Sequence, residues 1–127
     1  MKKVMSLLLA VLLLTGCAAS AEEITYRQVN MDEAITMMEE GSGYIILDVR
    51  TPEEFAEKHI PGAINVANET IGTDELPELP DKDQLILVYC RSGNRSKQAS
   101  EKLAALGYTN IVEFGGINDW HGETVTE

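Results

Sequence analysis

The segment Cys90-Arg91-Ser92-Gly93-Asn94-Arg95 combines a thiol with two guanidinium groups in six consecutive residues. Cysteine reacts as a thiolate, and nearby cationic side chains favour that ionised form. Glycine and asparagine tolerate positive φ, so successive N–H groups of this segment can turn inward and surround an anion. We therefore expect a nucleophilic cysteine beside an anion-binding loop. The candidate catalytic residue is Cys90, and the candidate ligand-binding residues are Arg91, Ser92, Gly93, Asn94, Arg95 and Ser96.

Alternating strands and helices are predicted to position this loop. The nearly continuous apolar runs at 44–49 and 85–89 are typical of strands buried on both faces of a parallel sheet. Shorter strands are expected at 24–29, 63–66 and 111–114. Together they predict one α/β domain whose open, mostly parallel sheet is flanked by helices. Ligands bind beyond the carboxyl ends of the strands in such sheets, and Cys90 directly follows the run 85–89.

Helix start and stop signals lie between these strands. Asn30 with Glu33 predicts a capping box and a helix that ends at Gly41. The segment Thr51-Pro52-Glu53-Glu54 predicts a second helix, which is short because Pro61-Gly62 follows. A third helix is expected over 96–106, with its positive dipole end toward Cys90. Residues 68–83 contain two prolines and predict a loop with one helical turn.

Composition limits the classes of function. The 127 residues are 44% hydrophobic, which fits a single globular domain. Lys and Arg number 10 against 21 acidic residues, and this net charge of −11 argues against a nucleic-acid partner. Two cysteines and two histidines are too few for the common zinc sites, so we predict no metal and no cofactor. Only a local cluster of cations could attract an anionic ligand to so acidic a chain. The acidic surface favours a monomer.

The N-terminus carries an export signal. Lys2 and Lys3 precede an apolar run at 4–14, which is too short to cross a bilayer. The segment Leu14-Thr15-Gly16-Cys17 resembles the lipobox of bacterial lipoproteins. That resemblance implies a signal peptide at 1–16, cleavage before Cys17 and acylation of its thiol. A short tether at 17–23 and the domain at 24–127 would follow.

The mature protein would then be a membrane-anchored lipoprotein that faces the periplasm or the cell exterior. Alternatively, Ala19-Ser20-Ala21 resembles a cleavage site that would release a soluble secreted protein. Loss of Lys2 and Lys3 would leave 8 basic against 21 acidic residues, a net charge of −13.

With Cys17 acylated or removed, Cys90 is the single remaining thiol. A lone thiol is a liability outside the cytoplasm unless its reactivity is used. A redox-sensing thiol would normally need a resolving cysteine nearby, and the mature chain has none. These observations favour a catalytic role for Cys90 over an inert place in the core.

Four segments, in order, resemble single-domain rhodaneses, and the resemblance as a whole runs from about Tyr26 to Trp120. They are Leu47-Asp48-Val49-Arg50-Thr51-Pro52-Glu53-Glu54-Phe55, His59-Ile60-Pro61-Gly62-Ala63-Ile64-Asn65, Cys90-Arg91-Ser92-Gly93-Asn94-Arg95 and Gly115-Gly116-Ile117-Asn118-Asp119-Trp120. The resemblance implies a rhodanese-like domain with sulfurtransferase activity. Its partners would be a small anionic sulfur donor such as thiosulfate and a nucleophilic acceptor such as cyanide or a thiol.

In that chemistry Cys90 would carry the transferred sulfur as a persulfide, and sulfite would leave. The resemblance also implies that Asp48 and Arg50, at the end of an adjacent strand, help to hold the loop; a simple surface ion pair is the alternative. His59 lies in a segment that resembles a structural turn of the family, and we assign neither it nor His121 a catalytic role.

Two other functions remain open. A non-catalytic module would bind a partner or sulfane sulfur without turnover. Cysteine-dependent phosphatases and arsenate reductases use Cys-x5-Arg loops, whereas four residues separate Cys90 from Arg95 here. The shorter loop makes a tighter ring of amides, which suits a single sulfur atom better than a tetrahedral oxyanion.

Overall fold

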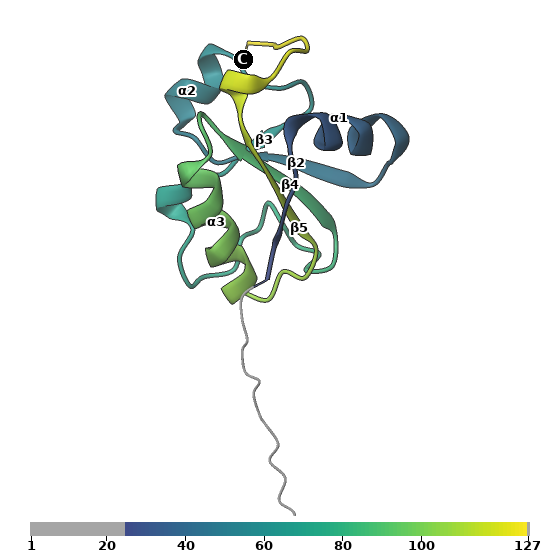
Figure 1. Ribbon diagram of the computed structural model, residues 1–127. Helices are drawn as coiled ribbons and strands as arrows, with labels where there is room; N and C mark the ends of the chain where they lie inside the picture. The colour runs from purple at the N-terminus through teal and green to yellow at the C-terminus, as the bar shows by residue number, and fades with distance from the viewer. Residues whose placement is uncertain (1–24, 127) are drawn as a thin grey trace, which may run out of the picture.

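The computed structural model describes residues 25–126 (Figure 1). The predictions about the signal peptide, Cys17, the tether and cleavage after Ala21 lie outside these residues and stay predictions. Ten elements follow one another along the chain. They are β1 (Arg27–Gln28), α1 (Met31–Glu40), β2 (Tyr44–Asp48), α2 (Pro52–Glu57), β3 (Ile64–Asn65), η2 (Asn68–Thr70), β4 (Leu85–Cys90), α3 (Asn94–Ala105), β5 (Ile111–Gly116) and η3 (Ile117–Asp119).

The strands form one open sheet in the order β1-β5-β4-β2-β3. Each of its four neighbouring strand pairs is parallel, and Leu47 in β2 lies opposite Val88 in β4. The only antiparallel contact in the described part is an isolated bridge between His59 and Val125. The predicted α/β class with an open, mostly parallel sheet is thus confirmed, because the two long apolar runs form its central strands.

Two hydrophobic cores lie on opposite faces of this sheet. Leu47, Val88 and Leu103 belong to the core under α3, whereas Ala34, Leu87 and Phe114 belong to the core under α1 and α2. Neighbouring residues of β4 alternate between the two cores because side chains of a strand point to opposite faces. Figure 1 shows the sheet between these helices. Within residues 25–126, no helix is long and apolar enough to span a membrane.

The helices start at the predicted caps, with one exception. Asn30 and Thr51 each form a complete capping box, with Glu33 and Glu54 respectively. The prediction for the third helix was wrong by two residues, because α3 begins at Asn94 and not at Ser96. Gly93 adopts φ 116°, and this left-handed conformation turns the chain directly from β4 into the helix. As a result, Ser96 lies in the first turn of α3.

All five strands differ from the predictions in their bounds. β2 ends one residue earlier, at Asp48, and β4 ends one residue later, at Cys90. β1 and β3 contain only two residues each, while β5 extends two residues beyond its predicted end, to Gly116. The register between β4 and β5 shifts between Val88 and Cys90, so Cys90 lies opposite Gly116. The shift carries β5 past the end of β4 and against the loop that follows Cys90. The single helical turn predicted in 68–83 is η2.

Gly116 allows this close approach. A Cβ atom at this position would lie 2.0 Å from the carbonyl oxygen of Arg91, which is backbone and has little freedom to move. The N–H of Asn118 donates to the same carbonyl at 3.1 Å. The backbone after Cys90 is therefore held directly by the end of β5.

We predict that Gly116→Ala destabilises the protein by about 1–3 kcal/mol, as expected for forced overpacking. Urea denaturation monitored by circular dichroism measures this loss. Gly72→Ala is the matched control, since its Cβ would meet nothing within 4 Å. The control should change the free energy of unfolding by less than about 0.5 kcal/mol. Equal effects of the two substitutions would contradict the close approach of β5 to the loop.

Candidate active site

Cys90 ends β4 at the carboxyl edge of the sheet, as predicted, and is only 1% exposed. The backbone N–H of Gly93 donates to its Sγ atom at 3.0 Å. Among residues 25–126, no other amide of the loop donates to this sulfur. One N–H group therefore contacts the sulfur, where several inward-facing N–H groups were predicted. The left-handed Gly93 that starts α3 therefore also aims the amide at the sulfur.

A hydroxyl and a carboxylate lie behind the sulfur. The Oγ atom of Ser96 is 3.4 Å from Sγ of Cys90 and 2.5 Å from Oε2 of Glu113. Glu113 is 2% exposed, although it is a carboxylate in the interior of β5. The thiol, the hydroxyl and the carboxyl group thus form one buried, hydrogen-bonded chain.

The two arginines of the loop are both paired with Glu54. Arg91 Nη2 lies 2.9 Å from Oε2 of Glu54, and Arg95 Nη1 lies 2.8 Å from Oε1. Hydrogen bonding to Arg95 is the largest influence on the pKa of Glu54 and holds it well below its usual value, so the carboxylate stays charged. The arginine charges predicted to bind an anion are therefore already shared with a carboxylate of this chain.

The other loop residues differ in exposure. Ser92 and Asn94 are exposed, whereas Gly93 and Ser96 are buried. Ser92 and Gly93 line a cleft of about 420 Å³ that also reaches Lys97 on α3 and Asn30 at the start of α1. Cys90 itself does not line this cleft, which reaches the site through Ser92, Gly93 and Glu113.

Asp48 and Arg50 form a buried ion pair, and not the surface pair that was the alternative. Arg50 Nη2 lies 2.6 Å from Oδ2 of Asp48 and donates to the carbonyl of Lys58 at 2.7 Å. Tyr89, the residue before Cys90, donates its hydroxyl to Asp48 at 2.6 Å and accepts from the N–H of Ile60 at 3.1 Å. Burial, followed by the hydrogen bond to Asp48, raises the pKa of Tyr89 above its usual value.

This network joins the ends of β2 and β4 to the segment that follows α2. Within residues 25–126, none of its hydrogen bonds reaches the loop after Cys90, so its link to the loop passes through Tyr89. The predicted supporting role of Asp48 and Arg50 is therefore indirect, through the strand that carries Cys90.

The two histidines do not take part in this site. His59 stacks on Phe55 with ring centroids 3.6 Å apart, and its Nδ1 lies 2.8 Å from the carbonyl of Phe55. His121 is exposed. In the described part of the chain, no group of three or more His, Cys, Asp or Glu side chains could hold a metal ion.

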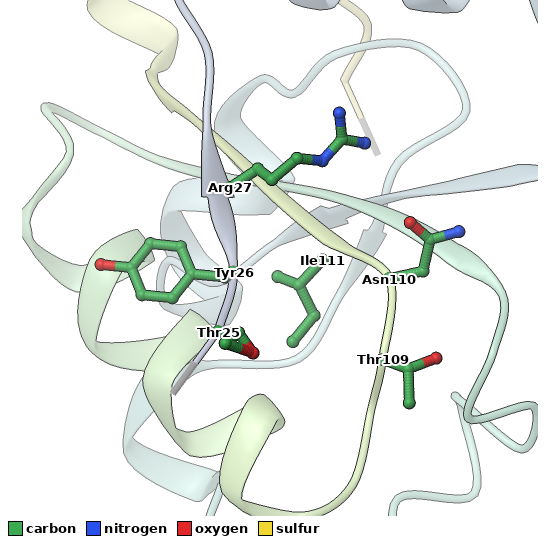
Figure 2. Close-up of a pocket in the computed structure, with 6 residues that line it drawn as sticks. All are labelled: Thr25, Tyr26, Arg27, Thr109, Asn110 and Ile111. Atoms are coloured by element: carbon green, nitrogen blue, oxygen red, sulfur yellow. The ribbon is translucent and has the colours of Figure 1, made fainter. Parts of the chain in front are cut away.

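A second hollow, of about 220 Å³, lies at the opposite edge of the sheet (Figure 2). It is lined by Thr25, Tyr26, Arg27, Thr109, Asn110 and Ile111. Each of these residues lies just before β1 or β5, or is the first residue of one of these strands. The hollow is therefore at the amino ends of two parallel strands. The hollow is therefore separated from Cys90 by the length of the sheet.

Two acidic residues of the site were not predicted from the sequence. Glu54 was recognised only as a capping residue of α2, and its contacts to Arg91 and Arg95 cross 37 and 41 positions. Glu113 had a weak signal, because it is the one charged residue of an otherwise apolar strand. Neither position reveals its partner without the arrangement of β5, α2 and α3.

Comparison with known proteins agrees with the fold. A family model described as Rhodanese-like domain matches residues 30–123. The chain is 38% identical over 73 residues to Thiosulfate sulfurtransferase PspE of Escherichia coli (strain K12), covering 58% of this chain and 70% of that protein. It is 37% identical over 90 residues to Thiosulfate sulfurtransferase 16, chloroplastic, of Arabidopsis thaliana, covering 62% and 75% respectively.

The structure is also similar to a solved rhodanese with anions from E. coli, with a TM-score of 0.60 and 34% identity over 66% of this chain and 99% of that one. The chain spans only 21% and 19% of two yeast relatives named Adenylyltransferase and sulfurtransferase UBA4. The similarity thus covers one domain of those larger proteins. With its matched family model, parallel sheet and strand-end cysteine loop, the chain belongs to the family of rhodanese-like domains, which includes sulfurtransferases.

Proposed function

We propose that this domain is a sulfurtransferase that carries sulfur as a persulfide on Cys90. The observation that carries the proposal is the N–H of Gly93, which points at Sγ from 3.0 Å at the start of α3. A donor N–H and the positive end of a helix dipole both stabilise negative charge on sulfur. The same contact can stabilise a thiolate before the reaction and a persulfide anion after it.

The transfer takes place in two displacements. The Cys90 thiolate attacks the outer sulfur of thiosulfate, a new S–S bond forms, and sulfite leaves with the electron pair of the old S–S bond. A nucleophilic acceptor such as cyanide or a thiolate then takes the outer sulfur, and Sγ leaves as thiolate. The cleft beside Ser92 and Gly93 has a volume of about 420 Å³, enough for small donors and acceptors.

The arginines favour this chemistry over phosphoryl transfer. A phosphatase of this kind needs a guanidinium group free to bind a tetrahedral oxyanion. Here Arg95 makes two hydrogen bonds to Glu54, at 2.8 and 3.1 Å. Sulfur transfer depends less on a free guanidinium group, because the negative charge that must be stabilised develops on Sγ.

We predict that incubation of the purified protein with thiosulfate adds one sulfur atom to its intact mass. The adduct should disappear on addition of cyanide and should not form in Cys90→Ser, because the thiol is the nucleophile. An adduct with polysulfide but not with thiosulfate would keep the mechanism and change the donor. A folded protein with a reactive Cys90 and no adduct from any sulfane donor would support the non-catalytic module.

Glu54 is proposed to compete with anionic donors for the two arginines. We predict that Glu54→Gln lowers the KM for thiosulfate several-fold while kcat changes little, since the released guanidinium groups can bind the donor. Glutamine at this position can still complete the capping box with Thr51. Glu53→Gln is the matched control, because Glu53 is exposed and in the same helical turn. An unchanged or higher KM in Glu54→Gln would show that the arginines do not bind the donor.

We further propose that Cys17 is acylated and holds the domain at the outer face of a membrane. This proposal rests on the sequence Leu14-Thr15-Gly16-Cys17 after an apolar run. In a bacterial host, the protein should fractionate with membranes and carry an acylated N-terminal Cys17, whereas Cys17→Ser should lose the acyl group. A free N-terminus at Glu22 in the soluble fraction would instead indicate cleavage after Ala21.

A further inference from the structure

Glu113 is a buried carboxylate for which the sulfur-transfer mechanism above has no use. It is 2% exposed, and among residues 25–126 no cationic side chain forms an ion pair with it. Its Oε2 atom accepts from the N–H of Gly115 at 3.0 Å and from the hydroxyl of Ser96 at 2.5 Å. A buried negative charge with so few partners is costly.

The hydroxyl of Ser96 connects Glu113 to the sulfur. Its Oγ atom lies within hydrogen-bonding distance of Cys90 Sγ, at 3.4 Å, and of Glu113 Oε2, at 2.5 Å. A serine hydroxyl has only one proton to donate. The carbonyl oxygens of Gly93 and Gly115 also lie near Oγ, at 3.0 and 3.3 Å, but the contact to Glu113 is the shortest. When Glu113 is ionised, the hydroxyl proton therefore faces the carboxylate, and Oγ accepts from the S–H of Cys90. When the sulfur is anionic, the hydroxyl can donate to sulfur if the carboxyl group is protonated and donates to Oγ.

We propose that Glu113 stores the proton of Cys90: as the sulfur becomes anionic, the proton passes through Ser96 to Glu113, and it returns when the sulfur is transferred. This inference rests on the proposed persulfide chemistry at Cys90. Glu113 does not touch the reacting atoms, so it is a positioning residue that acts through Ser96. The proton transfer keeps the number of negative charges constant among the hydrogen-bonded groups of Cys90, Ser96 and Glu113 during the reaction.

The atoms and charges balance. The S–H bond of Cys90 breaks and its proton goes to Oγ of Ser96, while the original hydroxyl proton goes to Oε2 of Glu113. The sulfur then bonds to the outer sulfur of thiosulfate, and sulfite leaves with the electron pair. The products are a persulfide anion, a serine hydroxyl, a neutral carboxyl group and sulfite. On transfer to the acceptor, Sγ leaves with the bonding pair and recovers its proton by the reverse path.

The groups around Glu113 explain why the proton from Cys90 would stay on this carboxyl group. Gln28 on β1 faces the carboxyl group, with Nε2 3.5 Å from Oε1. Lys97 on α3, Asp119 on η3 and Glu33 on α1 line the same cleft. The phenol of Tyr26, before β1, has a raised pKa because of burial first and then the charges of Glu101 and Glu113. Asp119, Glu33 and Glu101 are acidic and only Lys97 is basic, so a second buried negative charge beside an anionic sulfur is unfavourable.

Difference infrared spectroscopy tests this proposal on the purified protein. The persulfide-loaded protein is compared with protein whose Cys90 is alkylated by iodoacetamide, because a thioether is neutral and leaves Glu113 ionised. The loaded state should show the C=O band of a protonated carboxyl group, with loss of carboxylate absorption. Carbon-13 labelling of glutamate should shift this band, which distinguishes Glu113 from Asp48 and needs no substitution.

Glu113→Gln should abolish the band, because the amide can still accept from Ser96 but cannot take a proton. Glu101→Gln is the matched control, since Glu101 is an exposed carboxylate on the same helix as Ser96. The control should keep the band. Absence of the band in loaded wild-type protein, or its persistence in Glu113→Gln, would overturn the proposal.

Failure of the proton-store proposal can be distinguished from failure of the persulfide proposal. If mass spectrometry detects no sulfur on Cys90, the persulfide proposal fails, and the reduced protein still tests the proton store. In that case the glutamate C=O band should persist over the pH range in which the ultraviolet absorbance of the Cys90 thiolate first rises, because the remaining proton is on Glu113, and the band should be lost only when that second proton leaves. Thiolate absorbance that rises without any glutamate C=O band would overturn the proton store alone.

Discussion

The left-handed turn at Gly93 is the constraint on which the site depends. With φ at 116°, Gly93 lets the chain pass from the end of β4 at Cys90 to the start of α3 at Asn94 through a very short loop. The turn sets the distance of 3.0 Å between the Gly93 amide and the Cys90 sulfur, and it brings Ser96 within 3.4 Å of the same atom. β5 supports the turn from the other side, because Gly116 lets its backbone approach Arg91. A side chain at Gly116 would clash with the backbone of Arg91, and one at Gly93 would be strained by the positive φ.

Charge in this site is balanced locally and not by the protein as a whole. The chain carries a net charge of −11, yet the cysteine loop holds two arginines. Glu54 pairs with both, at 2.9 and 2.8 Å, and so reduces the attraction for anions at the entrance to the site. On the buried side of the sulfur, the carboxyl group of Glu113 accepts a hydrogen bond from Ser96. The two arginines at the surface and the buried sulfur are thus each accompanied by one glutamate.

The buried pair of Asp48 and Arg50 has a different function from these glutamates. It organises the backbone after β2 by binding Tyr89 and the carbonyl of Lys58. Removing one partner of such a pair would leave an uncompensated buried charge. The strand that ends in Cys90 is therefore held by Tyr89 on one face and by the core under α3 on the other.

The sequence alone determined the fold class, the two central strands, the caps at Asn30 and Thr51, and the position of Cys90 at a strand end. These features depend on local patterns: apolar runs, capping residues and glycines act within a few positions of one another. The start of α3, the pairing of both arginines with Glu54 and the contact between Glu113 and Ser96 were decided only by the tertiary structure. Each of the side-chain contacts joins elements 17 to 41 residues apart, so its geometry exists only once the sheet and helices have packed.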